Sequence, residues 1–322
     1  MTMRDLVLKL GVPLCLLALA PAQDLRRGVT DADAVIVARQ VGKTPHDDDL
    51  VMHRLQVLLD VRGAGGAQAV TVLDWPKLTL HQRPTPRQSR LYCLKDASAV
   101  ATRLGLPAAN GPYYKMVGWS GSNPLVGAEP TNDPSVKFAQ LLAAAEAGAP
   151  TADTAAALQN TAVRGDACVR LEATRLLVER PDLRGKLGGA HWSQLIARAT
   201  GELDDVPYKI ALAELCAEQR LDGVFDALIV SLGQVADPEY ARTVGRIGKV
   251  LHGEEAAARI QERLAIAGQS ADRAALLLAL GATDTNTALE ALLRMDNKDA
   301  AVGAALREHR SPRAKEAASR KK

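Results

Sequence analysis

The densest group of potential metal ligands in the sequence is the run His46-Asp47-Asp48-Asp49. A calcium-binding loop needs oxygen ligands at alternating positions and a distal glutamate, and this run has neither. It lies between two segments that we expect to be strands, so we interpret it as a solvated connection. The six histidines include no HxxxH or HExxH pair of the kind that holds zinc; they are His46, His53, His81, His191, His252 and His309. We therefore expect no metal and no other cofactor.

Two glycine-rich stretches have the composition of catalytic loops but not the spacing. In Gly118-Trp119-Ser120-Gly121-Ser122 the serine does not stand between two glycines as in GxSxG, and no strand-turn-helix frames it. The stretch GAGG at 63–66 is not followed by Lys-Ser or Lys-Thr, so it predicts a hairpin turn and not a phosphate-binding loop. The sequence therefore predicts no catalytic residue.

The first 22 residues have the pattern of an export signal. Arg4 and Lys9 lie in a short basic start, the apolar run LGVPLCLLALA follows, and Ala20-Pro21-Ala22 has the small-x-small form that signal peptidase accepts. We predict cleavage after Ala22 and a secreted or periplasmic protein. The alternative is an uncleaved anchor, but the apolar run is about half of the ~20 residues that a transmembrane helix needs. We expect no transmembrane segment after cleavage.

Removal of this signal leaves three cysteines, Cys93, Cys168 and Cys216, with no CxxC spacing. This number and spacing predict neither a zinc framework nor a dense disulfide scaffold. We interpret Cys168 and Cys216, which fall in helical segments, as small buried hydrophobic residues. If the compartment is oxidising, one pair could form a disulfide, and the sequence alone does not say which pair.

From residue 30 to 126 the apolar residues alternate with a period of two. Strands are expected at 34–41, 51–62, 69–73, 91–94 and 113–117, with Leu55, Val57, Leu59 and Val61 on one face of the second. Loops rich in Pro, Gly and Asn separate them. Five short strands in about a hundred residues predict a small antiparallel barrel or sandwich.

Three stretches of this β-rich segment, ADAVIVARQVG, HRLQVLLDVRG and RLYCLK, resemble the OB-like barrel of netrin and tissue-inhibitor type domains. The resemblance implies an OB-like β domain over 30–126. In the inhibitor family an N-terminal cysteine chelates the metal of a protease. That cysteine has no counterpart here, so the inhibitory activity is not carried over.

After a linker at 127–133 the sequence becomes helical, and one amphipathic pattern recurs. In DACVRLEATRLLVE, at 166–179, Asp166 is expected to cap a helix whose apolar stripe contains Val169, Ala173, Leu176 and Leu177. Aspartates that precede expected helices recur at intervals of 33, 39 and 32 residues, the range of two-helix repeats. An apolar residue and a base follow three and four positions after the first three of these aspartates.

This pattern resembles the HEAT repeat, whose signature is an Asp cap, then Val-Arg, then small and Leu positions in the second helix of each pair. The resemblance covers about 133–310 and implies an α-α solenoid in which the Asp and the base bond between neighbouring repeats. After Asp237 the base, Arg242, comes one residue late, so we expect this ladder to end before it. The expected caps and ladder residues are Asp133, Lys137, Asp166, Arg170, Asp205, Lys209 and Asp237.

The remaining helices complete this organisation. Partner helices are expected at 152–163, 190–199, 222–232, 254–266 and 285–295, and a last helix at 299–309. The helical repeats would thus occupy 134–310, and the basic residues 311–322 are expected to be a disordered tail. The competing interpretation is an irregular helical bundle.

The charge distribution limits the classes of partner. A formal net charge of +3 is too near balance to predict nucleic-acid binding, and the excess lies in the basic tract at 307–322, which could contact an anionic surface. A solenoid without catalytic residues predicts an exported interaction or scaffold protein that binds a protein partner in the cell envelope. The alternatives are an enzyme or lyase-like subunit built on HEAT-like repeats, as in lyases that handle bilin pigments, and an inhibitor or ligand-binding role for the β domain.

Overall fold

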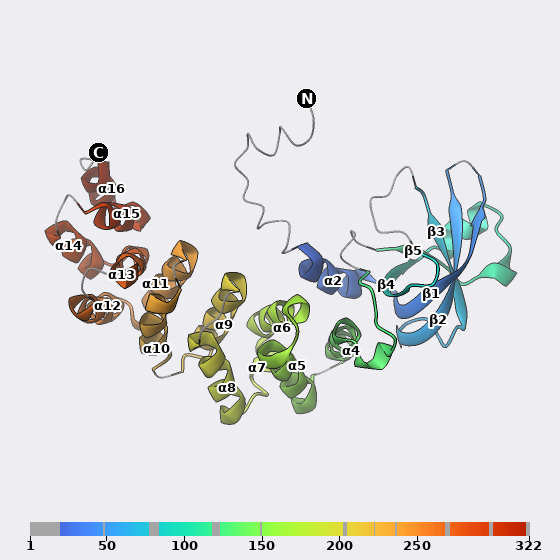
Figure 1. Ribbon diagram of the computed structural model, residues 1–322, viewed down its shortest axis with the longest axis horizontal. Helices are drawn as coiled ribbons and strands as arrows, with labels where there is room; N and C mark the ends of the chain where they lie inside the picture. Colours follow the sequence, from blue (N-terminus) through green and yellow to red (C-terminus); the bar gives the residue numbers. More distant parts are fainter. Residues whose placement is uncertain are drawn as a thin grey trace. The chain divides into compact units, whose positions relative to one another are not determined.

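A computed structural model describes residues 20–47, 49–76, 84–117, 123–148, 150–201, 205–221, 223–235, 237–267, 271–295 and 299–319. The chain divides into two compact units, Met1–Ala173 and Thr174–Lys322. All the strands belong to the first unit, and the second is helical where it is described (Figure 1). Each unit has its own core and is described by itself.

The strands of the first unit form a closed five-stranded barrel in the order β1-β2-β3-β5-β4. They are β1 (Ala34–Pro45), β2 (Val51–Arg62), β3 (Ala69–Asp74), β4 (Ser89–Asp96) and β5 (Tyr113–Met116). Each of the five expected strands is present, and of the two expected arrangements, barrel or sandwich, the strands form the barrel. The expectation of a wholly antiparallel sheet is wrong at one place, because β3 and β5 pair in parallel. This arrangement fits an OB-like barrel.

Alternation along the strands divides the apolar residues between two cores. Ile36, Leu55 and Val72 belong to the cluster inside the barrel. On the outside, Leu73 packs with Ala101 of the short helix α3 (Ser98–Arg103). Each strand therefore buries both faces where a helix covers it.

The glycine-rich stretch at 63–66 is the hairpin turn between β2 and β3 that was predicted. Gly63 has a φ of 82°, and a Cβ there would come within 2.1 Å of the Asp33 carbonyl oxygen. Asp60 accepts hydrogen bonds from the backbone N–H groups of Ala64 and Gly66, both at 3.2 Å. The turn is thus held by one carboxylate and requires glycine at its first position.

Two helices outside the expected β domain pack in the same unit. Helix α2 (Ala20–Asp31) contacts β4 and α4 (Pro134–Glu146), and α4 contacts β2. Arg62 donates to the carbonyl oxygens of Val29 and Ala32 and binds Glu146 Oε2 at 2.6 Å. Thr30 Oγ1 donates to Glu146 Oε1 at 2.8 Å. One arginine and one glutamate therefore link α2, β2 and α4.

The predicted leader lies mostly outside the described residues, which begin at Ala20, so the leader and its cleavage after Ala22 stay predictions. The expected linker at 127–133 contains the 3-10 turn η4 (Pro130–Asn132), which leads directly into α4. Helix α5 (Ala152–Arg164) then pairs with α4. Among the described residues, no helix is both long enough and apolar enough to cross a membrane.

Helix α6 (Ala167–Glu179) contains the boundary between the units, and the helices of the second unit follow it. They are α7 (Pro181–Arg184), α8 (Gly189–Thr200), α9 (Val206–Glu218), α10 (Val224–Ser231), α11 (Pro238–His252), α12 (Glu255–Ile266), α13 (Ala271–Ala282), α14 (Asn286–Arg294), α15 (Ala300–Glu308) and α16 (Pro312–Ser319). Most expected helices begin and end within about two residues of these bounds.

The helices of the second unit contact one another in two rows (Figure 1). In the first row α9 contacts α11, α11 contacts α13, and α13 contacts α15. In the second row α8 contacts α10, α10 contacts α12, α12 contacts α14, and α14 contacts α16. Glycines allow close packing in the first row. A Cβ at Gly245 would lie 2.1 Å from the carbonyl oxygen of Ala279, and a Cβ at Gly281 would lie 2.1 Å from the carbonyl oxygen of Ala305.

The expectation of a disordered tail at 311–322 is wrong for most of its length. Residues Pro312–Ser319 form α16, which packs on α14 and α15, and residues 320–322 lie outside the described part. Ser311 caps the helix by accepting the backbone N–H of Ala314 at 3.1 Å. Ala314 and Ala318 are buried one turn apart. The cap, a proline at the first helical position and this alanine pair outweigh the basic composition.

Candidate functional site

The predicted cap aspartates all lie at helix starts. Asp133 Oδ1 accepts the N–H of Ser135 at 2.9 Å at the start of α4, and Asp205 Oδ1 accepts the N–H of Tyr208 at 3.2 Å at the start of α9. Asp237 Oδ1 accepts two N–H groups at the start of α11, at 2.8 and 2.9 Å. The carbonyl of Asp166 accepts the first backbone bonds of α6. The side chains of Asp133, Asp205 and Asp237 thus satisfy helix N-termini, which is a structural role.

The bases that follow these aspartates differ from one another. Lys209 is 0% exposed, its Nζ donates to the carbonyl oxygen of Gly201 at 2.9 Å, and it lies 5.2 Å from the ring centroid of Tyr240. Burial raises the pKa of Tyr240 to about 12, and its hydroxyl lies 2.6 Å from Ser231 Oγ. Arg170 is half-buried and Lys137 is exposed. Lys209 thus joins the end of α8 to α11 from within the core.

A groove between α9 and α11 is one feature of the second unit that could receive a partner. It encloses about 210 Å³. Val250 is 69% exposed at its wall, whereas Ile247, one turn earlier on α11, is buried. The lining residues are Glu214, Ala217, Glu218, Arg220, Thr243, Arg246, Ile247 and Val250. The groove therefore combines an aliphatic wall with charged side chains.

Two of the four charged residues that line the groove form ion pairs with residues outside the lining. Arg246 Nη2 donates to Glu239 Oε1 at 2.7 Å and to Thr243 Oγ1 at 2.8 Å, and this hydrogen bond to Arg246 lowers the pKa of Glu239. Arg184 Nη2 donates to Glu218 Oε2 at 3.2 Å. For Glu214, burial in the groove raises the pKa of the carboxyl, against the opposing charge of Arg246. The Glu214 side chain is nonetheless exposed, and the groove lining contains two acidic and two basic side chains.

The barrel contains a second group of buried polar side chains, all at one end. His53 and Asp74 lie on neighbouring strands, 2% and 0% exposed, with Nε2 and Oδ2 3.4 Å apart. Gln40 and Arg90 are also buried, and Arg90 Nη1 donates to the carbonyl oxygen of Asn123 at 3.1 Å. All four residues occupy positions at which the alternation along their strands directs the side chain into the barrel. Neither ring nitrogen of His53 makes a hydrogen bond within the described part of the chain.

The sequence did not single out this barrel-end group, although a signal was present. Each member is a polar residue at a position where the period-two pattern calls for an apolar one, such as His53 two residues before Leu55. Among the described residues, no three His, Cys, Asp or Glu side chains come together as a metal site. The group therefore stands as a buried polar cluster without an assigned ligand.

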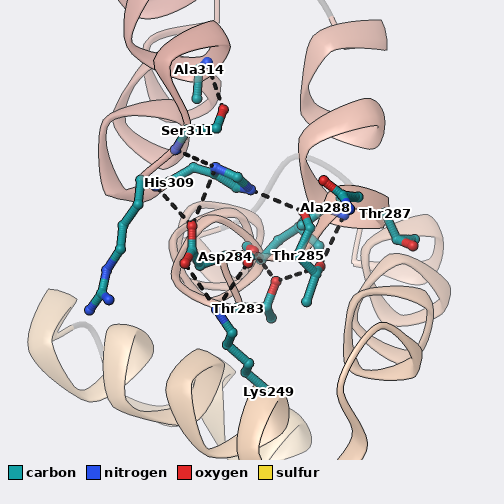
Figure 2. Close-up of polar contacts among 12 residues, drawn as sticks. Lys249, Thr283, Asp284, Thr285, Thr287, Ala288, His309, Ser311 and Ala314 are labelled. Carbon is teal, nitrogen blue, oxygen red and sulfur yellow. Dashed lines mark hydrogen bonds and ion pairs between the residues drawn. The ribbon is translucent and has the colours of Figure 1, made fainter.

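A third polar network joins the ends of five helices, and Figure 2 shows it around His309 and Asp284. The N–H of Ser311 donates to His309 Nδ1 at 3.1 Å, and His309 Nε2 lies 3.0 Å from the carbonyl oxygen of Thr285. Because Nδ1 accepts, the proton of the neutral ring lies on Nε2 and is donated to Thr285. Both ring nitrogens are satisfied, so the arrangement is structural.

Asp284 anchors the other side of this network. Its φ is 51°, and its carboxylate accepts hydrogen bonds from Lys249 Nζ and from the N–H of Arg310, both at 2.9 Å. Partial burial by itself raises the pKa of Asp284, but the bonds from Lys249 and Arg310 outweigh it and lower the pKa overall. The loop between α13 and α14 is thereby tied to α11 and to the end of α15.

Several residues of the sequence predictions lie outside the described part, namely Asp48, His81, the stretch at 118–122 and the side chain of Cys168. Cys93 and Cys216 are buried and form no disulfide within the described part of the chain, and burial raises the pKa of each to about 12. A thiol with so high a pKa is a poor nucleophile at neutral pH. Cys216 has the role of a small buried hydrophobic residue that was predicted for it.

Comparisons of the chain with protein-family models, with curated proteins and with solved structures found no match. The architecture therefore rests on the structure itself, as a five-stranded closed barrel followed by paired helices. The family resemblances drawn from the sequence remain proposals.

Proposed function

We propose that this is an exported, non-catalytic interaction protein whose HEAT-like helical repeats bind a protein partner in the cell envelope. The two rows of helices support this proposal, because each helix packs against the next in its row and against its pair, as in repeat proteins. Stacked repeats expose long surfaces made by one row, and such surfaces bind extended partners without doing chemistry. Export rests on the leader at 1–22 with its expected cleavage after Ala22.

The observation that carries the proposal is the groove between α9 and α11. A single exposed aliphatic residue on an open surface is ordinary. Val250 differs because it lines a groove together with the buried Ile247 and with charged side chains. An apolar centre with a polar rim is the usual composition of a protein interface. The groove also belongs to the row of helices whose aspartate caps define the repeat.

Photo-crosslinking in the source cells tests this proposal. A photoreactive amino acid at position 250 is expected to give a discrete crosslinked species in envelope fractions. The matched control is the same amino acid at position 230, because Val230 is 52% exposed on α10, in the other row. Val250→Arg should abolish capture by a crosslinker placed at position 217, while thermal unfolding stays unchanged. Equal crosslinking at 230 and 250, or none at 250 in a folded chain, would rule the groove out.

A further inference from the structure

We propose that the polar end of the barrel binds one divalent metal ion of the zinc type between β2 and β3. The principal ligands are His53 Nε2 and Asp74 Oδ2, Gln40 Oε1 is the third, and a water molecule completes the coordination. The site lies in the first unit and goes beyond the proposed function. Histidine spacing in the sequence did not indicate it, because its three ligands lie on three different strands.

The register of the barrel brings these three side chains to one part of its interior. His53 pairs with Val72 of β3, so Asp74, two residues further on, is its diagonal neighbour on the same face. Gln40 of β1 pairs with Leu55, so it is the diagonal neighbour of His53 on the other side. Long side chains reach one another across such diagonals. The three residues therefore form a row across β1, β2 and β3.

The separation of His53 and Asp74 is that of two ligands of one metal ion. Nε2 and Oδ2 are 3.4 Å apart, yet neither ring nitrogen of His53 makes a hydrogen bond within the described part of the chain. A histidine that is only 2% exposed normally has such a partner. Two ligands that are each about 2.1 Å from a tetrahedral zinc ion lie about 3.4 Å apart. The two side chains are thus spaced to share an ion.

Gln40 adds an oxygen atom at the same end of the barrel. Its Nε2 donates to the carbonyl oxygen of Gly42 at 3.3 Å, which orients the side-chain amide. Its Oε1 is buried, and no hydrogen bond to this atom exists among the described residues. An amide oxygen, a carboxylate and an imidazole nitrogen are all electron-pair donors, so one cation satisfies them together.

The ligand set also sets the strength of binding. Asp74 is 0% exposed, and a buried carboxylate is stabilised by a cation. One of its oxygens can bind the ion while the other accepts hydrogen bonds, so further contacts of Asp74 are compatible with the site. Among the described residues, no third His, Cys, Asp or Glu joins this pair. We therefore expect weaker binding than at a structural zinc site with four protein ligands.

Arg90 is the residue of this end that argues against a second cation. Its two terminal nitrogens donate to the carbonyl oxygen of Asn123 and to Gln88 Oε1, both at 3.1 Å. Arg90 belongs to β4, and in the closed barrel β1 and β5 separate β4 from the strands of His53 and Asp74. The guanidinium is thus held by groups on its own side of the barrel, away from the pair of ligands.

Zinc titration of the purified exported chain tests the proposal. After removal of metal by a chelator, calorimetry should show one zinc ion bound per chain, and zinc should raise the unfolding temperature. His53→Gln and Asp74→Asn should each weaken binding at least about 100-fold, because loss of even an outer-shell partner costs ten- to a hundredfold. Gln40→Leu should weaken it about tenfold. The matched control is His46→Gln, an exposed histidine next to β1, which should bind zinc as the wild type does.

Three results would overturn this inference. They are a wild-type chain that binds no stoichiometric zinc, a folded His53→Gln or Asp74→Asn variant that binds zinc as the wild type does, and binding that is lost in His46→Gln. If both buried variants fail to fold, X-ray absorption of the zinc-loaded wild type decides. One imidazole among nitrogen and oxygen neighbours at about 2.0–2.2 Å supports the site, and a spectrum without imidazole or with several contradicts it. Crosslinking at position 250 concerns the other unit, so either proposal can fail alone.

Discussion

At the scale of single residues, the same residue types serve two different ends in the second unit. Lys209 is fully buried and bound to the carbonyl of Gly201, and the carboxylate of Asp284 accepts hydrogen bonds from Lys249 and Arg310. Such groups have partners within the chain and stabilise the fold. Glu214 has the same kind of charge, but its side chain is exposed and makes no hydrogen bond or ion pair within the described part of the chain. Partners within the fold, and not residue type, separate these groups from an ordinary surface charge.

The pH dependence of stability tests the role of Asp284. Its folded pKa is lowered, so its bonds stabilise the protein above the unfolded pKa near 3.8 and are lost as the pH falls through the lower folded pKa. We expect Asp284→Asn to lose about 1 kcal/mol of unfolding free energy at pH 7, a modest value because Lys249 is half exposed and solvent screens the pair. Asparagine tolerates the left-handed backbone at this position.

This difference between wild type and Asp284→Asn should persist at pH 5 and shrink toward zero as the pH falls below the unfolded pKa and through the lower folded pKa. Urea denaturation at several pH values measures it. The control is Glu262→Gln, which removes a carboxylate without a bond and should leave stability nearly unchanged at every pH. A difference between Asp284→Asn and wild type that stays constant down to pH 2 would mean that the ionised carboxylate is not the source.

At the scale of elements, the first row of helices depends on backbone approach. Gly245 lies against α13 and Gly281 against α15, where a side chain would meet a carbonyl oxygen. Glycine is costly inside a helix, by roughly 1 kcal/mol relative to alanine, so its presence at both contacts indicates a packing need. Successive helices of the row therefore approach one another more closely than larger residues would allow.

Replacing Gly281 by alanine tests this close packing. The new Cβ would lie 2.1 Å from the Ala305 carbonyl oxygen, and neither backbone can move away without disturbing its helix. We expect a loss of about 1–3 kcal/mol in unfolding free energy, measured by urea denaturation. Gly189→Ala is the matched control, because a Cβ there meets nothing within 4 Å, and it should be neutral or stabilising. Equal stability of the two variants would show that α13 and α15 can separate freely.

At the scale of the whole molecule, the first unit is more than the β domain expected from the sequence. Helix α2 buries Leu25 and Val29, and Arg62 of β2 binds the carbonyls at its end. Glu146 of α4 completes the connection. The barrel is therefore one part of a unit that includes helices from both sides of it in sequence.

Truncation tests whether the barrel needs α2. A chain that begins at Asp33 should be less stable than one that begins at Gln23 by about 3 kcal/mol or more, because Leu25 and Val29 lose their burial. Thermal unfolding followed by circular dichroism compares the two chains. The loss of stability should be confined to the thermal transition in which the circular-dichroism signal of the strands disappears. Unchanged unfolding of the shorter chain would show that α2 is an independent appendage.

The sequence by itself determined the elements. The expected strand at 51–62 matches β2, and the caps Asp133, Asp205 and Asp237 lie at the helix starts where they were predicted. Both signals are local, because a period-two alternation and a side chain that binds its own helix need no distant partner. Helix α16 was not predicted because its basic composition is typical of a disordered tail, although a serine caps it and two of its alanines are buried.

Only the tertiary structure decided what each apolar face meets. The alternation of β3 does not say that β5 lies beside it in parallel, nor that His53 comes within 3.4 Å of Asp74. Likewise, the stripe on α11 predicts a buried face but not that Val250 remains exposed beside Glu214 of α9. Periodicity assigns a residue to a face of its own element, whereas a site requires residues from two elements that close packing brings together.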